Sequence, residues 1–270
     1  MTSPPPDFIA LPFTGDWEGV PAITRFFVLA SDEEPSFETD VRLAWSEEGL
    51  HFNARLIDSC LTAKIEVDGG PIWHDPAFEI FLDPDCKGVD YYEWEINGNG
   101  AVWGLQMDRP YVANGTPVCT LNDLVPDYEV WVEGTLGEAT EFWQIEGMVP
   151  WRNIGGKPER LRANFCRVHH RKEGDIEWQS SAPLPVVDYH RPYGWGRVHL
   201  LSDLGELPGA CEDWDTIFAM AEACGMTRNS RGEGLDIPED AVRTLEGWVL
   251  TRGNLSLDQD GRWNGMGRIS

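Results

Sequence analysis

Short runs with apolar residues at every second position recur through most of residues 24–201, and they constrain the fold more than any other feature. The first such run places Val41, Leu43 and Trp45 at alternate positions. Alternation with a period of two sends successive side chains to opposite faces of a strand. Turn residues separate this run from eight others, at 50–56, 77–83, 90–97, 100–107, 128–135, 141–149, 162–169 and 196–201. Nine short strands predict an all-β, antiparallel sandwich of jelly-roll type.

The pattern changes after Leu204, which predicts a domain boundary. We expect the sandwich to span residues 8–204 and a small mixed C-terminal appendage to span residues 205–270. Helical spacing in the appendage predicts one amphipathic helix carrying Trp214, Ile217, Phe218, Ala221 and Cys224. Further on, residues 248–250 and 254–257 predict a short hairpin around Arg252 and Gly253.

The charge of the chain excludes two classes of partner. Its 46 acidic and 21 basic residues give a formal charge of -25. Such a chain is repelled by phosphate backbones and by anionic lipid surfaces, so we expect neither nucleic acid nor a membrane as partner. No apolar run reaches the roughly 18 residues of a membrane helix. The charge specifies neither a substrate nor an oligomeric state.

Cysteine and histidine spacing gives no sign of a zinc or redox site. The six cysteines are too far apart for a zinc knuckle or a Cys-x-x-Cys pair, and we expect mainly buried thiols, with one disulfide left open: Cys60, Cys86, Cys119, Cys166, Cys211 and Cys224. The six histidines form no His-x-x-x-His pair, so we expect no catalytic transition metal. Residues 1–8 contain neither the basic nor the apolar segment of a signal peptide.

Two predicted strands carry carboxylates on one face. In residues 77–83, Glu79 alternates with apolar neighbours, and in residues 91–97 Glu93 and Glu95 do the same. Carboxylates placed close together repel, so they need either solvent or a counter-charge such as Arg167. A simple solvated sheet face is the alternative explanation.

At these strands the chain resembles the family 9 carbohydrate-binding modules, a β-sandwich group related to DOMON-like domains. The resemblance covers about residues 13–202 and depends on the order of several motifs, none of which is specific alone. They are Val41 to Trp45, Trp73 with Asp75, Phe78 to Asp83, Tyr92 to Asn97, Trp143 to Trp151, Ala163 to Arg167 and His190 to Gly196. It implies a secreted or periplasmic protein, although no signal peptide is visible in this sequence.

The resemblance also implies a binding site for a carbohydrate, the terminal sugar of an oligo- or polysaccharide. In that family two aromatic side chains clamp the sugar, and the matching positions here are Trp73 and Tyr189. Glu79 resembles a hydroxyl-binding glutamate. Glu95 stands where the best-known pattern has an arginine, and Arg167 stands where it has a glutamine. The resemblance therefore does not identify which sugar is bound. The physics agrees, because a pyranose packs its C–H face on an aromatic ring while its hydroxyls need polar partners.

Two other functions remain open. Glu79 and Glu95 on neighbouring strands match the paired carboxyls of a glycoside-active enzyme, either hydrolase or lyase. Haem binding in the DOMON manner would need a Met and His pair, for which Met107 and His190 are the candidates. Nothing in the sequence assigns a cofactor. The resemblance implies a structural calcium ion, for which Asp83, Asp85 and Asp90 offer oxygen ligands.

Overall fold

The computed structural model confirms an all-β fold and describes most of the chain. It describes residues 5–110, 119–171, 174–184, 186–192, 194–202 and 204, together with four short strands between residues 227 and 265. The predicted helix over 214–224 lies outside the described residues, as does the predicted strand at 248–250. Strand β17 (Leu255–Leu257) pairs instead with β18 (Trp263–Gly265), and β15 (Thr227–Arg228) pairs with β16 (Leu235–Asp236).

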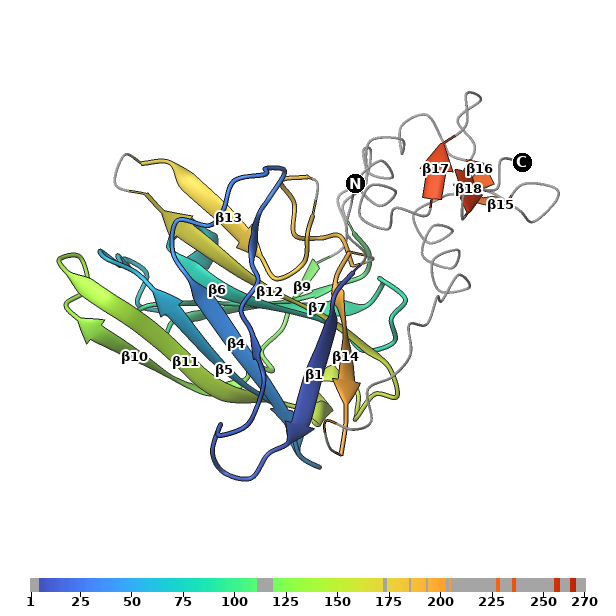
Figure 1. Cartoon of the computed structure of the whole chain (residues 1–270), viewed down its shortest axis with the longest axis horizontal. Helices are drawn as coiled ribbons and strands as arrows, with labels where there is room; N and C mark the ends of the chain where they lie inside the picture. The colour runs from blue at the N-terminus through green and yellow to red at the C-terminus, as the bar shows by residue number, and fades with distance from the viewer. Residues whose placement is uncertain are drawn as a thin grey trace.

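One curled sheet forms both layers of the sandwich (Figure 1). One layer contains β10 (Asp127–Gly134), β11 (Thr140–Pro150), β5 (Gly49–Ile57) and β4 (Thr39–Trp45). The other contains β12 (Leu161–His170), β6 (Ala77–Asp83), β7 (Tyr91–Asn97), β8 (Val102–Met107) and β9 (Cys119–Leu121). Strands β1 (Asp7–Pro12) and β14 (Gly196–Leu200) join the two layers along one side.

The sheet is mixed, because one strand departs from the antiparallel pairing of the others. Strand β1 runs parallel to both β14 and β4, while the other pairings are antiparallel. Three short strands add to the sheet: β2 (Ala22–Ile23) pairs with β4, and β13 (Ile176–Ser180) lies between β12 and β3 (Phe27–Val28). Among the described residues, no helix is long and apolar enough to cross a membrane.

Two apolar clusters lie on the two faces of the β12-β6-β7 layer. Phe78, Ile80 and Trp94 face the other layer and form the main core with residues such as Phe52 and Trp143. The opposite face packs beneath loops in a second cluster that includes Phe81, Tyr91, Val168, Leu184 and Trp195. Strand β6 is therefore buried along its whole length. The alternative explanation, a simple solvated sheet face, does not hold for this strand.

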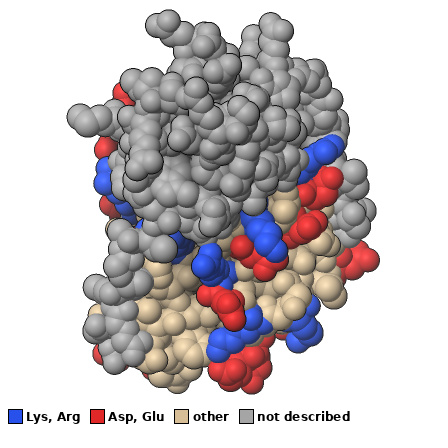
Figure 2. Space-filling view, turned by 90° about the vertical axis from the view of Figure 1, so that its right-hand side faces the viewer, with Lys and Arg blue, Asp and Glu red and all other residues tan. Residues whose placement is uncertain are grey.

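The surface carries mixed charge. On the face in Figure 2, acidic and basic side chains alternate across the described part and do not gather into one patch of a single sign. The excess of acid in the sequence is thus not gathered on the described part of this face. The strong local concentration of carboxyl groups lies instead in a pocket over the second cluster.

Candidate functional site

A pocket on the outer face of the β6-β7 strands brings four of the five sequence-predicted residues together. Trp73, Glu79, Glu95 and Tyr189 all line it, and its volume is about 320 Å³. That volume lies at the lower end of the range for small-molecule sites. Its remaining lining residues are Leu29, Glu93, Trp178, Val187, Asp188 and His190.

Trp73 stands at the rim of the pocket on a short 3-10 turn. The turn, η1 (Ile72–His74), is anchored by Ile72, which is fully buried, and by the buried carboxylate of Asp75. Asp75 Oδ2 accepts hydrogen bonds from the backbone N–H groups of Lys64 and Ile65 at 2.8 and 2.9 Å. The indole of Trp73 remains 41% exposed. A large aromatic side chain held open by a rigid turn is suited to contact with a ligand.

Trp103 packs against the ring of Trp73. The two indoles meet edge to face, with ring centroids 5.0 Å apart. Trp103 comes from β8, where it pairs directly with Glu95 of β7. The exposed wall of the pocket is therefore tied to the same strands that carry its carboxyl groups.

The floor of the pocket is acidic because of strand register. Glu79 of β6 pairs directly with Glu95 of β7, and Glu93 lies two positions further along the same face of β7. All three carboxyl side chains are buried, with residual exposures of 3% for Glu79 and 6% for Glu95. The Oε2 atoms of Glu93 and Glu95 are enclosed and accept no hydrogen bond from any other described residue, but the two carboxyl groups can hydrogen-bond to each other when one is protonated.

Burial and mutual repulsion favour the protonated form of these acids. Burial, with Glu95 and Glu93 adding to it, raises the pKa of Glu79 well above its ordinary value of 4.5. Burial and Glu95 likewise raise the pKa of Glu93, and burial raises the pKa of Glu95 to about 7. The pocket therefore holds both protons and negative charge near neutral pH.

The loop that carries Tyr189 closes the other side of the pocket. The backbone carbonyl of Tyr189 accepts a hydrogen bond from Trp195 Nε1 at 2.8 Å, and Trp195 is fully buried. The hydroxyl of Tyr189 donates to the carbonyl oxygen of Arg167 at 2.9 Å, and its ring is only 6% exposed. Tyr189 thus forms the inner wall, and its hydroxyl is occupied by the backbone.

His190 and Asp188 complete this side. His190 Nδ1 is 2.8 Å from the hydroxyl of Tyr91, and its Nε2 is 3.8 Å from Glu93 Oε2. Burial lowers the pKa of His190 to about 4, so the ring is neutral at pH 7. The carboxylate of Asp188 pairs with Arg191 at 2.8 Å. Met107, the proposed haem partner of His190, is fully buried at the end of β8 and does not line the pocket.

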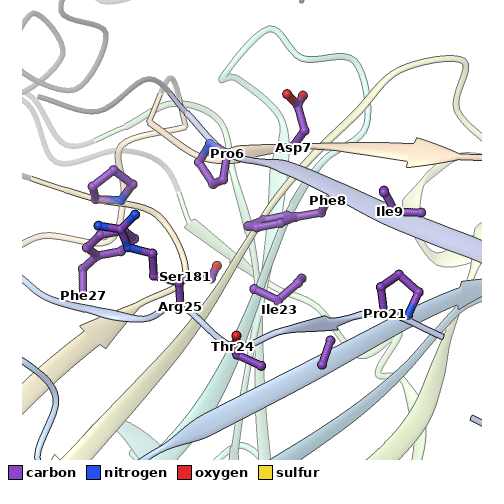
Figure 3. A pocket seen from close by; sticks show the side chains of 12 residues that line it. Pro6, Asp7, Phe8, Ile9, Pro21, Ile23, Thr24, Arg25, Phe27 and Ser181 are labelled. Atoms are coloured by element: carbon purple, nitrogen blue, oxygen red, sulfur yellow. The ribbon is translucent and has the colours of Figure 1, made fainter. Parts of the chain in front are cut away.

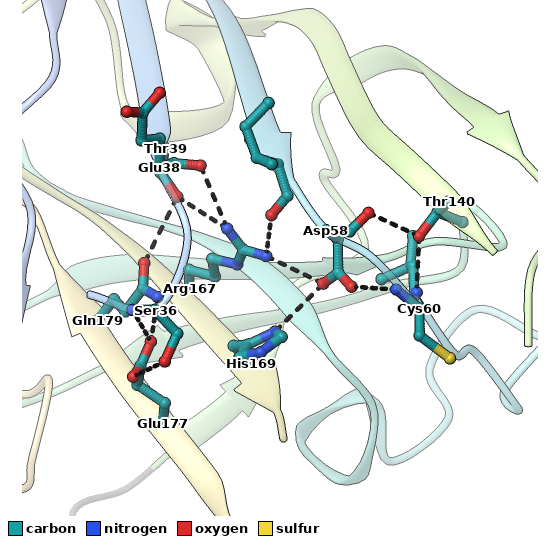
Figure 4. A network of polar contacts seen from close by, with 12 residues as sticks. Ser36, Glu38, Thr39, Asp58, Cys60, Thr140, Arg167, His169, Glu177 and Gln179 are labelled. Atoms are coloured by element: carbon teal, nitrogen blue, oxygen red, sulfur yellow. Dashed lines mark hydrogen bonds and ion pairs between the residues drawn. The ribbon is translucent and has the colours of Figure 1, made fainter. Parts of the chain in front are cut away.

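Arg167 is not on the floor of this pocket, so its expected position beside the two glutamates is wrong. Its neighbour Cys166 pairs with Glu79, whereas Arg167 pairs with Phe78 and therefore faces the space between the layers. There Arg167 is 1% exposed, and its Nη2 binds Asp58 Oδ2 at 3.0 Å and the carbonyl of Ile57 at 2.6 Å (Figure 4).

The interactions of Arg167 are structural. Its Nη1 donates to Thr39 Oγ1 at 3.2 Å, which links β12 to the start of β4. Asp58 also accepts a hydrogen bond from the backbone N–H of Cys60 at 2.9 Å and lies 3.2 Å from His169 Nδ1. This buried network, shown in Figure 4, ties the two layers together at one end of the sandwich.

Six of the lining residues were not predicted as site residues, and two of them, Glu93 and Trp178, add a carboxyl group and an indole ring to the pocket. Glu93 belongs to the same alternation that identified Glu95, so the signal for it was present. Trp178 lies on β13, and its place beside the pocket depends on the pairing of Trp178 with Val168 of β12. This hairpin was not predicted, although the residues between the two strands include Gly174 and Asp175, which are typical of turns.

The aspartates named as calcium ligands do not fit a calcium site. Asp83 is fully buried, and its two carboxylate oxygens accept backbone N–H groups of Lys87 and Gly88 at 3.2 and 2.8 Å. Asp85 instead contacts the Lys87 ammonium group at 3.2 Å, and Asp90 is a turn residue with a φ of 55°. Within the described part of the chain, no three His, Cys, Asp or Glu side chains form a group that could hold a metal ion.

Another cavity is larger but chemically different. It has a volume of about 390 Å³ and lies between β1, β2 and β3, where its lining is mainly apolar (Figure 3). Its one carboxylate, Asp7, pairs with Arg197 at 3.0 Å and with His199 at 2.8 Å. This cavity offers no set of converging polar groups comparable to that of the acidic pocket.

Comparison with known proteins supports the fold. No family model matches the sequence, and no curated protein matches it. Among solved structures, a candidate carbohydrate-binding protein of Bacteroides uniformis ATCC 8492 is similar, with 16% identity and a TM-score of 0.55. The match covers 73% of this chain and 99% of the other.

Two structures of a family 9 carbohydrate-binding module from Caldicellulosiruptor kristjanssonii are also similar. The complex with cellotriose has 11% identity and a TM-score of 0.51, and covers 76% of this chain and all of the module. The complex with glucose has 11% identity and a TM-score of 0.50, and covers 75% of this chain and all of the module. At such low identity the likeness concerns architecture. The chain therefore has the β-sandwich fold of the family 9 carbohydrate-binding modules.

Proposed function

We propose that this protein binds a carbohydrate without cleaving it, in the pocket between Trp73 and Tyr189. One observation carries the proposal: an exposed indole stands at the rim of a pocket whose buried carboxyl groups receive no hydrogen bond at Glu93 Oε2 and Glu95 Oε2 from any described residue outside that pair. The fold adds support, since the similar structures include modules solved with cellotriose and with glucose.

In this proposal each group has a distinct role. Trp73 packs against the C–H face of a sugar ring, and Tyr189 with Trp178 forms the inner aromatic wall. The carboxyl groups of Glu79, Glu93 and Glu95 bind the sugar's polar groups. Hydrogen bonds that involve a charged partner contribute about 1.5–3 kcal/mol each, against about 0.5–1.5 kcal/mol for neutral ones. Arg167 stabilises the sandwich and does not touch the ligand.

A glycoside-active enzyme is the second candidate, because Glu79 and Glu95 are directly opposed across β6 and β7. A glycosidase needs one protonated carboxyl as acid and one ionised carboxylate as base or nucleophile. Here all three pocket glutamates have a raised pKa, that of Glu95 being about 7, and no lysine or arginine among the described lining residues holds one of them fully ionised. The site therefore favours binding over cleavage.

The experiment is a glycan array followed by calorimetric titration of the best ligand, with Trp73→Ala as the test variant. Trp131→Ala is a matched control, because Trp131 is 45% exposed on β10 in the other layer. We expect Trp73→Ala to weaken binding at least tenfold, about 1.4 kcal/mol, and Trp131→Ala to leave it within twofold. Absence of binding to every sugar, or equal binding by Trp73→Ala, would contradict the proposal.

Prolonged incubation of the wild type with the bound oligosaccharide distinguishes the two candidates. We expect no shortened product by chromatography. If the wild type releases product and Glu79→Gln binds with the same affinity but releases none, the enzyme replaces the binding protein as the function.

A further inference from the structure

Among the residues that the structure describes, the acidic pocket has no cation of its own. Four carboxyl groups line it, and its described lining contains no lysine or arginine. Asp188 is already paired with Arg191 at 2.8 Å. The three glutamates have no such partner among the lining residues, and Arg167, which the sequence suggested as their counter-charge, binds Asp58 on the other face of β12.

Two of the carboxyl groups depend on each other for a hydrogen bond. Glu93 and Glu95 are close enough to share one when either is protonated, and no other described group donates to Glu93 Oε2 or Glu95 Oε2. The nearest ring nitrogen is His190 Nε2, 3.8 Å from Glu93 Oε2, which is too long for a hydrogen bond. Buried acceptors are nearly always satisfied in folded proteins, so donors supplied by a ligand are the natural complement.

The aromatic walls favour the same kind of ligand. The faces of indole rings carry negative potential and attract cations that approach within about 6 Å. Trp73 and Trp178 both line the pocket. An ammonium group brings a positive charge and three donors, whereas a hydroxyl group brings one donor and no charge.

We propose that the ligand of this pocket is an amino sugar whose protonated amine lies against Glu93 and Glu95 while its ring packs on Trp73. This inference rests on the proposed function and narrows it to a chemical class. A neutral sugar would leave the glutamates mainly protonated and would form no charge-assisted hydrogen bond with them. An N-acetylated sugar would also do so, because its amide is uncharged and supplies a single N–H donor.

The raised pKa values of the pocket glutamates support the proposal and predict that the affinity for an amino sugar depends on pH. A bound ammonium group favours the ionised carboxyl groups, so binding lowers the raised pKa values of Glu79, Glu93 and Glu95 and releases protons. Affinity should therefore rise as pH increases from 5 to 7. The other titratable groups around the glutamates are Cys166 on β12, with Asp188, Tyr189, His190 and Arg191 on the loop.

The test compares three trisaccharides that share one linkage and differ at one substituent. Cellotriose carries a hydroxyl group, fully deacetylated chitotriose an ammonium group, and triacetylchitotriose a neutral amide at the same carbon. By titration calorimetry of the full chain at pH 7, we expect chitotriose to bind at least tenfold more tightly than the other two. Repeating the titration in two buffers of different ionisation enthalpy should reveal proton release.

Variants connect the preference to the pocket. Glu95→Gln, or Glu93→Gln if the first does not fold, should reduce the preference for chitotriose to within about threefold. Glu129→Gln, an exposed position on β10, is the control and should retain it.

Each other outcome has a defined meaning. If cellotriose binds as tightly as chitotriose, the amino-sugar inference fails and the proposed function stands. If spermidine, a cation with no sugar ring, binds as tightly as chitotriose, the site recognises charge alone and the inference fails. If no sugar in the array binds, both fail.

Discussion

At the scale of single residues, one position along a strand decides between a binding role and a structural one. Cys166 and Arg167 are neighbours on β12, yet the first faces the acidic pocket beside Glu79 and the second faces the opposite layer. A shift of one position reverses the face of every side chain on a strand. The roles of the pocket glutamates and of Arg167 can therefore be separated by experiment.

We predict that Arg167→Met lowers the free energy of unfolding by about 3–5 kcal/mol, because it leaves the Asp58 carboxylate buried without its partner. Urea denaturation measures the change. Arg152→Met, at an exposed position, should stay within about 0.5 kcal/mol of the wild type. The milder Arg167→Lys, if folded, should keep its affinity for sugar. A stable Arg167→Met protein that no longer binds sugar would place Arg167 back in the site.

The buried acids predict a specific dependence of stability on pH. Burial raises the pKa of Glu95 from 4.5 to about 7 in the folded state. Below pH 4.5 both states are protonated, and its stabilising contribution is complete. As pH rises from 4.5 to 7, the unfolded chain ionises while the folded chain keeps its proton, so the contribution is lost.

We therefore expect the wild type to lose about 3 kcal/mol of stability relative to Glu95→Gln between pH 4.5 and pH 8. His190 works in the opposite direction, because its pKa is lowered to about 4, but it is present in both proteins and cancels in the difference. Urea denaturation at the two pH values gives the result. A difference that is constant with pH would show that Glu95 titrates as it does in the unfolded chain.

At the scale of elements, alternation predicted every strand of seven or more residues and missed several short ones. The predicted strand at 77–83 has the same bounds as β6, and the other eight runs correspond to observed strands within two residues. The sandwich strands that were missed all have six residues or fewer: β1, β2, β3, β9 and β13. Alternation also gave no sign of which distant strands pair, such as the parallel pairing of Phe8 with Val198.

The same limit applies to the candidate site: alternation predicts the face on which a side chain lies, but not how loops enclose that face. The shared face of Glu79 and Glu95 could be read from alternation, and the structure brings Trp73 and Tyr189 to the same pocket. The position of Arg167 could also have been read from alternation, because Phe165, two residues earlier, is a core residue. The enclosure of the pocket could not be predicted from alternation, because it depends on how the loop around Tyr189 folds over the sheet.

The parallel strand β1 provides a test at this scale. A Cβ atom added at Gly196 on β14 would lie 2.3–2.7 Å from three ring atoms of Phe8, which is buried on β1. We predict that Gly196→Ala destabilises the protein by about 1–3 kcal/mol, through overpacking. Thermal and urea denaturation measure the loss. The double variant with Phe8→Leu should recover part of it, and a neutral Gly196→Ala would contradict the observed packing of these two strands.

At the scale of the molecule, a two-layer sandwich separates stability from recognition. The main core lies between the layers, and the buried Arg167 and Asp58 network ties them at one end. The acidic pocket lies on the outer face of one layer, beneath the loop that carries Tyr189. Substitutions at the rim of the pocket should therefore affect binding with little effect on folding.

The most direct test of sugar binding in the acidic pocket is a crystal structure of the protein soaked with the sugar that binds most tightly in the array. We predict a sugar ring stacked on Trp73, with polar groups within hydrogen-bond distance of Glu79 or Glu95. A sugar bound elsewhere on the molecule, with the acidic pocket unchanged, would contradict it.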